Sequence, residues 1–332
     1  MRVLIVLPGA LGDVIRALPL LGRLRGARPE AWLAWAVEAP SAPLLDGHPW
    51  LDRVLVFERE RGVRAFLPFL RRVRAERCEV VLDLGRGVKS ALVALASGAT
   101  LRVGFARADG REGSWLVANR RLPPQGTGRS KLEQFLAFGD ALGLPAAPVG
   151  FGLAPTPREV GEAARLLDGL DGPLIAACVG SSCPSRRWFP ERTAAVLRAL
   201  RDRRGTSGVL LGTAADEAFA RAAAAAAGAG VRSLVGRTTL RQLLAVLARA
   251  RLAFGPDSGA LHLAAALGTP AVSLWGATSA ARSTPFGCEG LAVSGTAPCA
   301  PCFLKDCPIG RVCMRAIGAD AVLARAEAAL AA

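Results

Sequence analysis

The chain has no tyrosine, only two histidines and only three lysines among its 332 residues, and aromatic residues make up 5% of it. So few aromatic side chains give nucleic-acid bases little to stack on, which argues against a single-strand binder. Charged residues are 21% and hydrophobic residues 52%. That balance excludes a disordered tail or a coiled coil, and the length allows two domains with a core each.

A long hydrophobic run is also missing. Every apolar stretch is interrupted by charged or polar residues, glycine or proline well before the roughly 20 residues that a spanning helix needs. The first apolar run ends at Pro8 and Gly9, and it is shorter than a signal peptide requires. We interpret it as a first β-strand and expect a cytoplasmic protein.

What the sequence has in excess is arginine, which gives a formal net charge of +15. Such a charge favours a polyanionic partner, which could be nucleic acid, phosphorylated lipid headgroups or an anionic saccharide. The alternative is a solvated basic surface without a partner. The charge does not choose among these alternatives.

Strand-like and helix-like stretches alternate in both halves of the chain. This alternation predicts an α/β protein with parallel sheets covered on both faces. A helix should open at Asp13, and Pro19 should kink or shorten it. The Pro-rich segment 154–157 is the best linker candidate, so we expect domains at 1–154 and 158–332. The expected strands are 2–7, 31–37, 54–57, 80–84, 101–105, 174–179, 209–211, 252–254 and 271–275.

The turn after the first strand is the first candidate site. Gly9 and Gly12 allow a tight turn and a close backbone approach, although their spacing is not that of a dinucleotide fingerprint. Asp13 stands where an N-cap would stand. The functional alternative is a carboxylate that faces an interdomain cleft and accepts a proton from a hydroxyl group.

A second candidate site follows a strand near residue 254. Asp257, Ser258 and Gly259 open a helix whose backbone N–H groups and dipole could hold an anion. His262, on the first turn, could add a donor, or it could be a core-facing histidine beneath an ordinary cap.

The loop after the strand near residue 178 is the third candidate. It carries Ser181, Ser182, Arg186 and Arg187 just before a helix that starts at Pro190. Arginines at the carboxyl end of a strand can clamp a diphosphate with forked hydrogen bonds. The alternative is an exposed basic loop with Trp188 anchored in the core.

Taken together, these segments resemble glycosyltransferase family 9, the heptosyltransferases of the lipopolysaccharide inner core. The opening GALGDVIRALPLL, the RWFPER segment and above all GPDSGALHLAAALGTPAVSLWGATS carry the resemblance, which runs over essentially the whole chain. It implies a GT-B fold, with two Rossmann-like domains that face a cleft. The N-terminal domain would bind the acceptor, the C-terminal domain would bind ADP-L-glycero-D-manno-heptose, and the inverting transfer would need no metal or other cofactor.

The resemblance also implies roles for single residues. Asp13 matches the base of the family, and Asp257, Ser258, Gly259 and His262 match its donor-diphosphate loop. Where the family usually has a lysine, this chain has Arg186 or Arg187, and the acidic residue after the next strand is Asp216 or Glu217. The acceptor would be anionic lipopolysaccharide core at the inner leaflet of the inner membrane, with no nucleic acid involved. Two alternatives remain: a GT-B nucleotide-sugar epimerase, and a non-catalytic binder of sugar nucleotides or polyanions.

The stretch 59–77 combines arginines with an apolar stripe. This pattern fits a helix on a membrane surface that bears lipid A phosphates, or a helix that packs its stripe on the sheet. The arginines are Arg61, Arg64, Arg71, Arg72, Arg74 and Arg77, around Phe66, Leu67, Phe69, Leu70 and Val73.

Four of the eight cysteines cluster near the C-terminus. The spacing of Cys299, Cys302, Cys307 and Cys313 could serve a structural zinc site, although the last two gaps are irregular. Buried or partly oxidised thiols are the alternative. The tail is similar to that of heptosyltransferase II-like members of the family.

Overall fold

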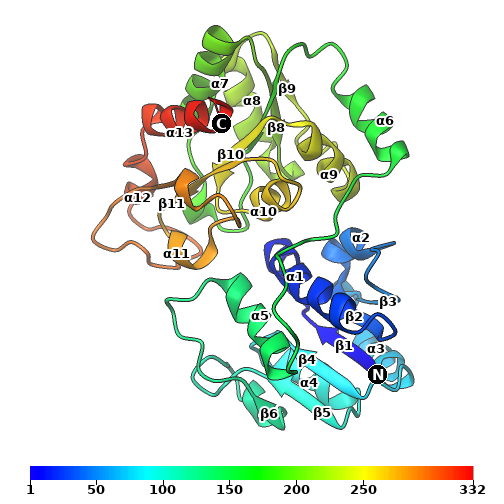
Figure 1. Cartoon of the computed structure of the whole chain (residues 1–332). Coiled ribbons are helices and arrows are strands. Elements are labelled where there is room, and N and C mark those ends of the chain that lie inside the picture. The colour runs from blue at the N-terminus through cyan, green and yellow to red at the C-terminus, as the bar shows by residue number, and fades with distance from the viewer. Residues whose placement is uncertain (332) are drawn as a thin grey trace. The chain divides into compact units, whose positions relative to one another are not determined.

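The computed structural model describes residues 1–331, without the side chains at positions 61 and 63, so the side chain of Arg61 lies outside the described part. The chain divides into two compact units, Met1–Gly152 and Leu153–Ala332 (Figure 1). Each unit contains its own parallel sheet with helices between the strands. The predicted α/β class with two Rossmann-like sheets is confirmed.

The sheet of the first unit has the strand order β3-β2-β1-β4-β5-β6, and all its neighbours are parallel. This is the dinucleotide-fold order, in which the chain reverses direction across the sheet between β1 and β4. Ligands in such sheets bind where the carboxyl ends of those two strands diverge. The strands are β1 (Arg2–Val6), β2 (Trp32–Glu38), β3 (Arg53–Phe57), β4 (Val80–Asp83), β5 (Leu101–Gly104) and β6 (Arg120–Arg121).

Helices α3 and α4 supply one hydrophobic layer of the first unit. Phe69 and Val73 of α3 and Val93 of α4 are buried against Leu4 and Val81 of the sheet. Helices α1 and α5 pack against each other. The helices and short 3₁₀ turns are α1 (Leu11–Ala27), η1 (Ala39–Ser41), α2 (Ala42–Leu45), η2 (Arg59–Arg61), α3 (Val63–Ala75), α4 (Val88–Ala96), η3 (Ser114–Leu116) and α5 (Lys131–Ala141).

The sheet of the second unit has the order β12-β11-β10-β7-β8-β9, again parallel throughout. Numbered from its own first strand and read from the other edge, this is the same order as in the first unit. Its switch point therefore lies between β7 and β10. The strands are β7 (Leu174–Cys178), β8 (Ser207–Leu211), β9 (Val231–Ser233), β10 (Leu252–Pro256), β11 (Ala271–Trp275) and β12 (Ala292–Ser294).

One core cluster joins this second sheet to α7, α8 and α13 through buried side chains such as Leu197, Ala223 and Val322. Helix α9 contacts both α6 and α10. The helices and 3₁₀ turns are α6 (Pro157–Leu166), η4 (Pro184–Arg186), α7 (Pro190–Arg204), η5 (Ala214–Asp216), α8 (Glu217–Ala227), α9 (Leu240–Arg249), α10 (Gly259–Ala266), α11 (Ala280–Ser283), η6 (Glu289–Leu291), α12 (Val312–Arg315) and α13 (Ala319–Ala331).

Two sequence predictions about helix starts need correction. Helix α1 begins at Leu11, and its N-cap is Ala10 without a side-chain cap, so Asp13 is the third helical residue instead of the cap. The helix also continues through Pro19 to Ala27, so the proline does not shorten it. In the expected linker, Thr156 caps α6 with a capping box and Pro157 is its first residue. The second half of the segment 154–157 therefore belongs to the start of α6 and not to a linker.

The packing of helix α3 distinguishes between the two interpretations of residues 59–77, a helix on a membrane surface and a helix packed on the sheet. Phe69 and Val73 have exposed fractions of 4% and 0%, and Phe66 and Leu70 pack against the same cluster. Most of the apolar stripe therefore packs on the sheet and is not free to enter a membrane, whereas Leu67 is 60% exposed. The arginines on the other side of α3, among them Arg64, Arg71 and Arg74, remain exposed.

Candidate functional site

Asp13 lies one helical turn into α1, directly after the carboxyl end of β1. Arg16 donates from Nη2 to Asp13 Oδ1 at 2.5 Å, and Lys131, at the start of α5, donates from Nζ to the same oxygen at 2.8 Å. The side chain of Asp13 keeps a quarter of its surface exposed. The carboxylate is thus fixed by two cations through one oxygen and still reaches solvent.

The two cations set the protonation state of this carboxylate. Burial by itself raises the pKa of Asp13, but the charges and hydrogen bonds of Arg16 and Lys131 outweigh it and hold the pKa well below its usual range. Asp13 is therefore ionised at neutral pH. It is also a weak base, since a low pKa leaves little affinity for a proton.

The glycines of the first motif allow this placement. A Cβ on Gly9 would lie 3.3 Å from the side chain of Leu7 and 3.5 Å from Cβ of Asp13, so a larger residue would crowd the turn. Gly12 is buried in the first turn of α1.

A second carboxyl group lies at the same edge of the first sheet, and the sequence analysis missed it. Asp83 ends β4 and pairs in register with Val6 at the end of β1. Its exposed fraction is 6%, and Oδ1 accepts a hydrogen bond from Gly85 N at 3.0 Å. Burial raises the pKa of Asp83 to about 7. The sequence did contain a signal for Asp83, because an acidic residue that directly follows the apolar residues of a parallel strand is a candidate site residue.

In the second unit, Asp257 gathers the loops that follow β7, β10 and β11. Its Oδ2 accepts hydrogen bonds from Arg186 Nη1 at 3.0 Å and from Thr278 Oγ1 at 3.0 Å. Its backbone oxygen accepts one from Ser181 Oγ at 2.9 Å. The structure thus brings Ser181, Arg186 and Asp257 together at the switch point of the second sheet, and adds Thr278.

Arg187 turns to a different partner. Its Nη2 lies 2.8 Å from Oδ1 of Asp216, whose side chain is 2% exposed in the turn after β8. Asp216 also closes a capping box with Thr213. Of the two acids left open by the sequence, Asp216 is thus the one that contacts a site arginine, while Glu217 is exposed. Ser182 is exposed as well.

Helix α10 points its first turn at this network. Ser258 is its N-cap but makes no side-chain cap, and Ser258 Oγ is a buried oxygen without a hydrogen-bond partner in the described part of the chain. The Nε atoms of Arg186 and Arg187 are in the same condition. His262, the fourth residue of α10, is 4% exposed. Ser258 Oγ lies at the N-terminus of α10, and Arg186 is held by the adjacent Asp257, an arrangement that could hold an anion.

The zinc site that the spacing of the tail cysteines allows stays a prediction. Among the described residues, no three His, Cys, Asp or Glu side chains form a group that could hold a metal ion. Cys313 is buried beside Gly276, Cys299 is exposed, and Cys307 Sγ accepts a hydrogen bond from Arg311 N at 3.1 Å. Burial raises the pKa of the Cys313 thiol, and Cys299, Cys302 and Cys307 lie near enough to Cys313 to raise it further.

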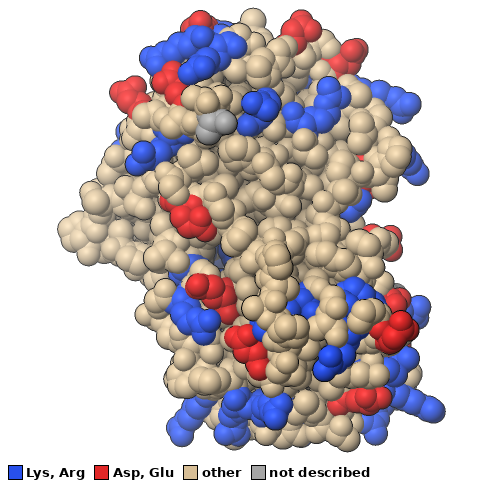
Figure 2. All heavy atoms as spheres, viewed as in Figure 1, with Lys and Arg blue, Asp and Glu red and all other residues tan. Residues whose placement is uncertain are grey.

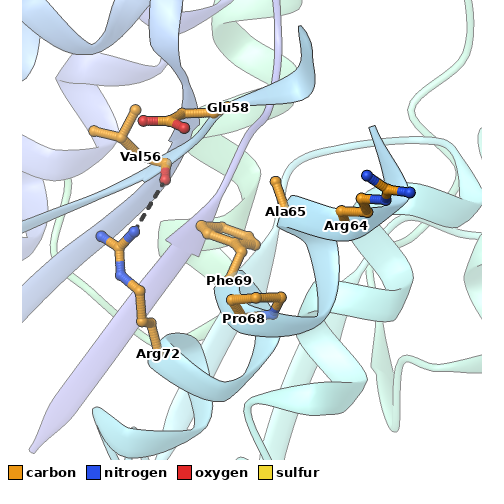
Figure 3. A pocket seen from close by; sticks show the side chains of 7 residues that line it. All are labelled: Val56, Glu58, Arg64, Ala65, Pro68, Phe69 and Arg72. Atoms are coloured by element: carbon orange, nitrogen blue, oxygen red, sulfur yellow. Dashed lines mark hydrogen bonds between the residues drawn. The ribbon is translucent and has the colours of Figure 1, made fainter. Parts of the chain in front are cut away.

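A pocket of about 530 Å³ opens between the end of β3 and helix α3 (Figure 3). Arg64 and Arg72 bring two positive charges to it and Glu58 brings one negative charge, while Pro68 and Phe69 form its apolar wall. Arg72 also donates to Val56 O at 3.5 Å. Figure 2 shows that basic side chains are widespread on the face it presents, with acidic ones between them. No helix of residues 1–331 is both long and apolar enough to span a bilayer.

Comparison with known proteins gives consistent matches. A family model described as glycosyltransferase family 9 (heptosyltransferase) matches residues 66–313. Lipopolysaccharide heptosyltransferase 1 of Pseudomonas aeruginosa is 32% identical, over 92% of this chain and 87% of its own. A family 9 glycosyltransferase structure from Veillonella parvula superposes with a TM-score of 0.87 at 19% identity, over 99% of this chain and 97% of its own. The Escherichia coli ADP-heptose lipopolysaccharide heptosyltransferase II has a TM-score of 0.78 at 24% identity, over 100% and 99%.

Proposed function

The chain belongs to glycosyltransferase family 9, the heptosyltransferases, and from that premise we propose that it moves a heptose from ADP-L-glycero-D-manno-heptose to the inner core of lipopolysaccharide, with inversion at the anomeric carbon. Membership makes the chain a glycosyltransferase, which sets aside the epimerase and the non-catalytic binder. The observation that carries the residue assignment is the pair of charged groups at the two switch points, Asp13 in one unit and the Asp257 network in the other.

We assign the donor to the second unit, residues 153–332. The backbone N–H groups of Ser258 and Gly259 at the start of α10 would hold the diphosphate, with Ser258 Oγ, His262 and the arginine Nε atoms as further donors. These hydrogen-bond donors are in place before the sugar nucleotide binds. They could therefore stabilise the negative charge that develops on the leaving ADP. Asp257 and Asp216 would position Arg186 and Arg187, respectively.

We assign the acceptor and the proton transfer to the first unit, residues 1–152. Arg16 and Lys131 bind one oxygen of Asp13, so Oδ2 would take the proton of the attacking hydroxyl. Because the pKa of Asp13 is low, it would take that proton late, when the new glycosidic bond is largely formed and the hydroxyl has become strongly acidic. The basic pocket beside α3 would bind anionic groups of the acceptor.

We further propose that the protein works in the cytoplasm, at the inner leaflet of the inner membrane, where a lipid-linked acceptor would be presented to it. The large positive charge supports contact with an anionic lipid surface.

Asp13→Asn tests the assignment of the base. Turnover should fall roughly 10²–10⁴-fold because the amide cannot take the proton. Binding of ADP-heptose, measured by thermal shift beside UDP- and GDP-sugars, should persist and should exceed binding of the other two. The exposed Asp46→Asn serves as the control and should keep wild-type turnover. Near-normal turnover of Asp13→Asn would remove it from the mechanism, and a preference for UDP- or GDP-sugars would refute the donor assignment.

A further inference from the structure

Helix α4 turns apolar side chains toward solvent. Val88, Leu92 and Leu95 are 41%, 41% and 52% exposed, and they stand on one face at positions i, i+4 and i+7. The opposite face, with Ala91, Val93 and Ala94, is already buried in the unit. A water-exposed helix normally shows polar residues on its outer face, so this one has the reverse pattern.

Two neighbouring elements extend this apolar face. Leu116, 73% exposed, ends η3, which contacts α4. Leu67, 60% exposed, belongs to α3, which also contacts α4. Leu67 shares a stripe of α3 with Arg71 and Arg74, and Arg74 Nη1 donates to Ser97 O at the end of α4, at 3.2 Å. This stripe therefore borders α4.

The rim of the surface is basic. Lys89 on α4 and Arg71 and Arg74 on α3 are exposed beside the apolar side chains. The acid Glu112 accepts a hydrogen bond from Val88 N at the N-terminus of α4, at 3.0 Å. A carboxylate at that position stabilises the helix through its dipole. An apolar face bordered by lysine and arginine is complementary to a bilayer with anionic headgroups, because the leucines can enter the interface while the cations meet the phosphates.

We propose that Leu67, Val88, Leu92, Leu95 and Leu116, with Arg71, Arg74 and Lys89, form the surface by which the protein docks on an anionic bilayer. The proposal rests on the proposed function, which places a lipid-linked acceptor in a membrane. The pocket that holds Arg64 and Arg72 lies along the adjacent stripe of α3, so docking would bring that pocket next to the headgroups.

The test is co-sedimentation of the full chain with phosphatidylglycerol–phosphatidylethanolamine vesicles and with neutral phosphatidylcholine vesicles, at low and high salt. Wild type should bind the anionic vesicles, and more weakly at high salt. Leu92→Gln/Leu95→Gln should lower its partition coefficient about tenfold, because two half-exposed leucines no longer enter the interface. Arg71→Gln should lower it several-fold, and on anionic vesicles only. The control Val160→Gln/Ile309→Gln removes two side chains of similar exposure from the second unit and should bind as wild type.

Three results would overturn the proposal: wild type that stays in the supernatant, a leucine variant that binds as wild type, and a control pair that loses as much binding. A wild-type dimer that the leucine variant converts to monomer, without vesicle binding, would make this face a contact between copies instead. Transfer to a lipid-free acceptor saccharide separates this proposal from the proposed function. The folded leucine variant should retain that transfer, whereas its absence in wild type would refute the proposed function itself.

Discussion

At the scale of single residues, the pKa values of two carboxyl groups at the same edge of one sheet are shifted in opposite directions. Asp13 has two cations within hydrogen-bonding distance and a low pKa, whereas burial raises the pKa of Asp83 to about 7. Asp83 accepts a hydrogen bond from Gly85 N, and no cation of the described residues is among the causes that set its pKa. The environment, and not the residue type, therefore makes Asp13 the carboxyl group of the two that is ionised at neutral pH.

Lys131→Met tests how Asp13 is held. Loss of one cation should raise the pKa of Asp13, so the acid limb of the profile of kcat/KM against pH should move to higher pH. Turnover should also fall, roughly 10-fold or more, because the carboxylate loses one of its two anchors. Lys131→Arg keeps the charge and should restore the acid limb. A methionine variant with an unchanged pH profile would show that Lys131 is only a structural contact.

Asp83→Asn tests the buried acid through stability. The folded-state pKa of Asp83 lies above that of the unfolded chain, so the folded state binds more protons between about pH 4 and about pH 7, and wild-type stability falls as pH rises through that window. Asparagine does not titrate. Its free energy of unfolding relative to wild type should therefore rise by about 1–4 kcal/mol between about pH 5 and about pH 8. Urea titrations at both pH values measure this difference, and a pH-independent difference would contradict the assignment.

The sequence was informative about residues that follow strands and uninformative about their distant partners. Asp13, Arg186 and Asp257 were predicted as site candidates because each stands just after a buried apolar run. Lys131 was not, because it is 118 positions from Asp13 and meets it only through the packing of α5 on α1. Thr278 was missed for the same reason, since its contact with Asp257 needs β11 beside β10.

At the scale of elements, hydrophobic periodicity located the nine predicted strands but missed the short edge strands β6, β9 and β12, and it did not say what each face of a helix contacts. The strand at 271–275 and the helix from Ala319 occur as predicted. The arginine-rich stretch could be a membrane helix or a packed one, and only the sheet beneath α3 decides for packing. The exposure of the leucines of α4 could not be predicted, because the sequence of this helix has apolar residues on every face and does not show which face is buried.

A two-pronged ion pair between helices α6 and α9, which we call the fork, provides a stability test at this scale. Arg241 of α9 donates to both carboxylate oxygens of Glu159 on α6, at 2.7 and 2.8 Å, and these bonds lower the pKa of Glu159 to about 2. Glu159→Gln should cost about 1–2 kcal/mol of unfolding free energy at neutral pH, measured in urea. The cost should shrink as pH falls from about 4.5 toward 2, because protonation removes the same attraction in wild type.

The control for this fork is Arg158→Gln. Arg158 also pairs with a glutamate of α6, but its side chain is 88% exposed, so its loss should be nearly neutral. Equal destabilisation by the two variants would show that general loss of charge on α6, and not the fork, produces the effect.

At the scale of the whole molecule, the same strand order is used twice, and each sheet carries its polar loops at its switch point. Alternating strands and helices predicted two such domains. The order within each sheet could not be derived from that pattern, because it depends on which strands pair across long crossovers. The proposal that the first unit binds the acceptor and the second binds the donor assigns different substrates to two sheets of the same strand order.

The most direct test of the proposed function is an NMR analysis of the reaction of the whole chain with ADP-heptose and a lipopolysaccharide inner-core acceptor. We expect one ADP to be released for each heptose transferred, and a product with the anomeric configuration opposite to that of the donor. Retained configuration, or conversion of ADP-heptose to an isomer in the absence of acceptor, would contradict the proposed function.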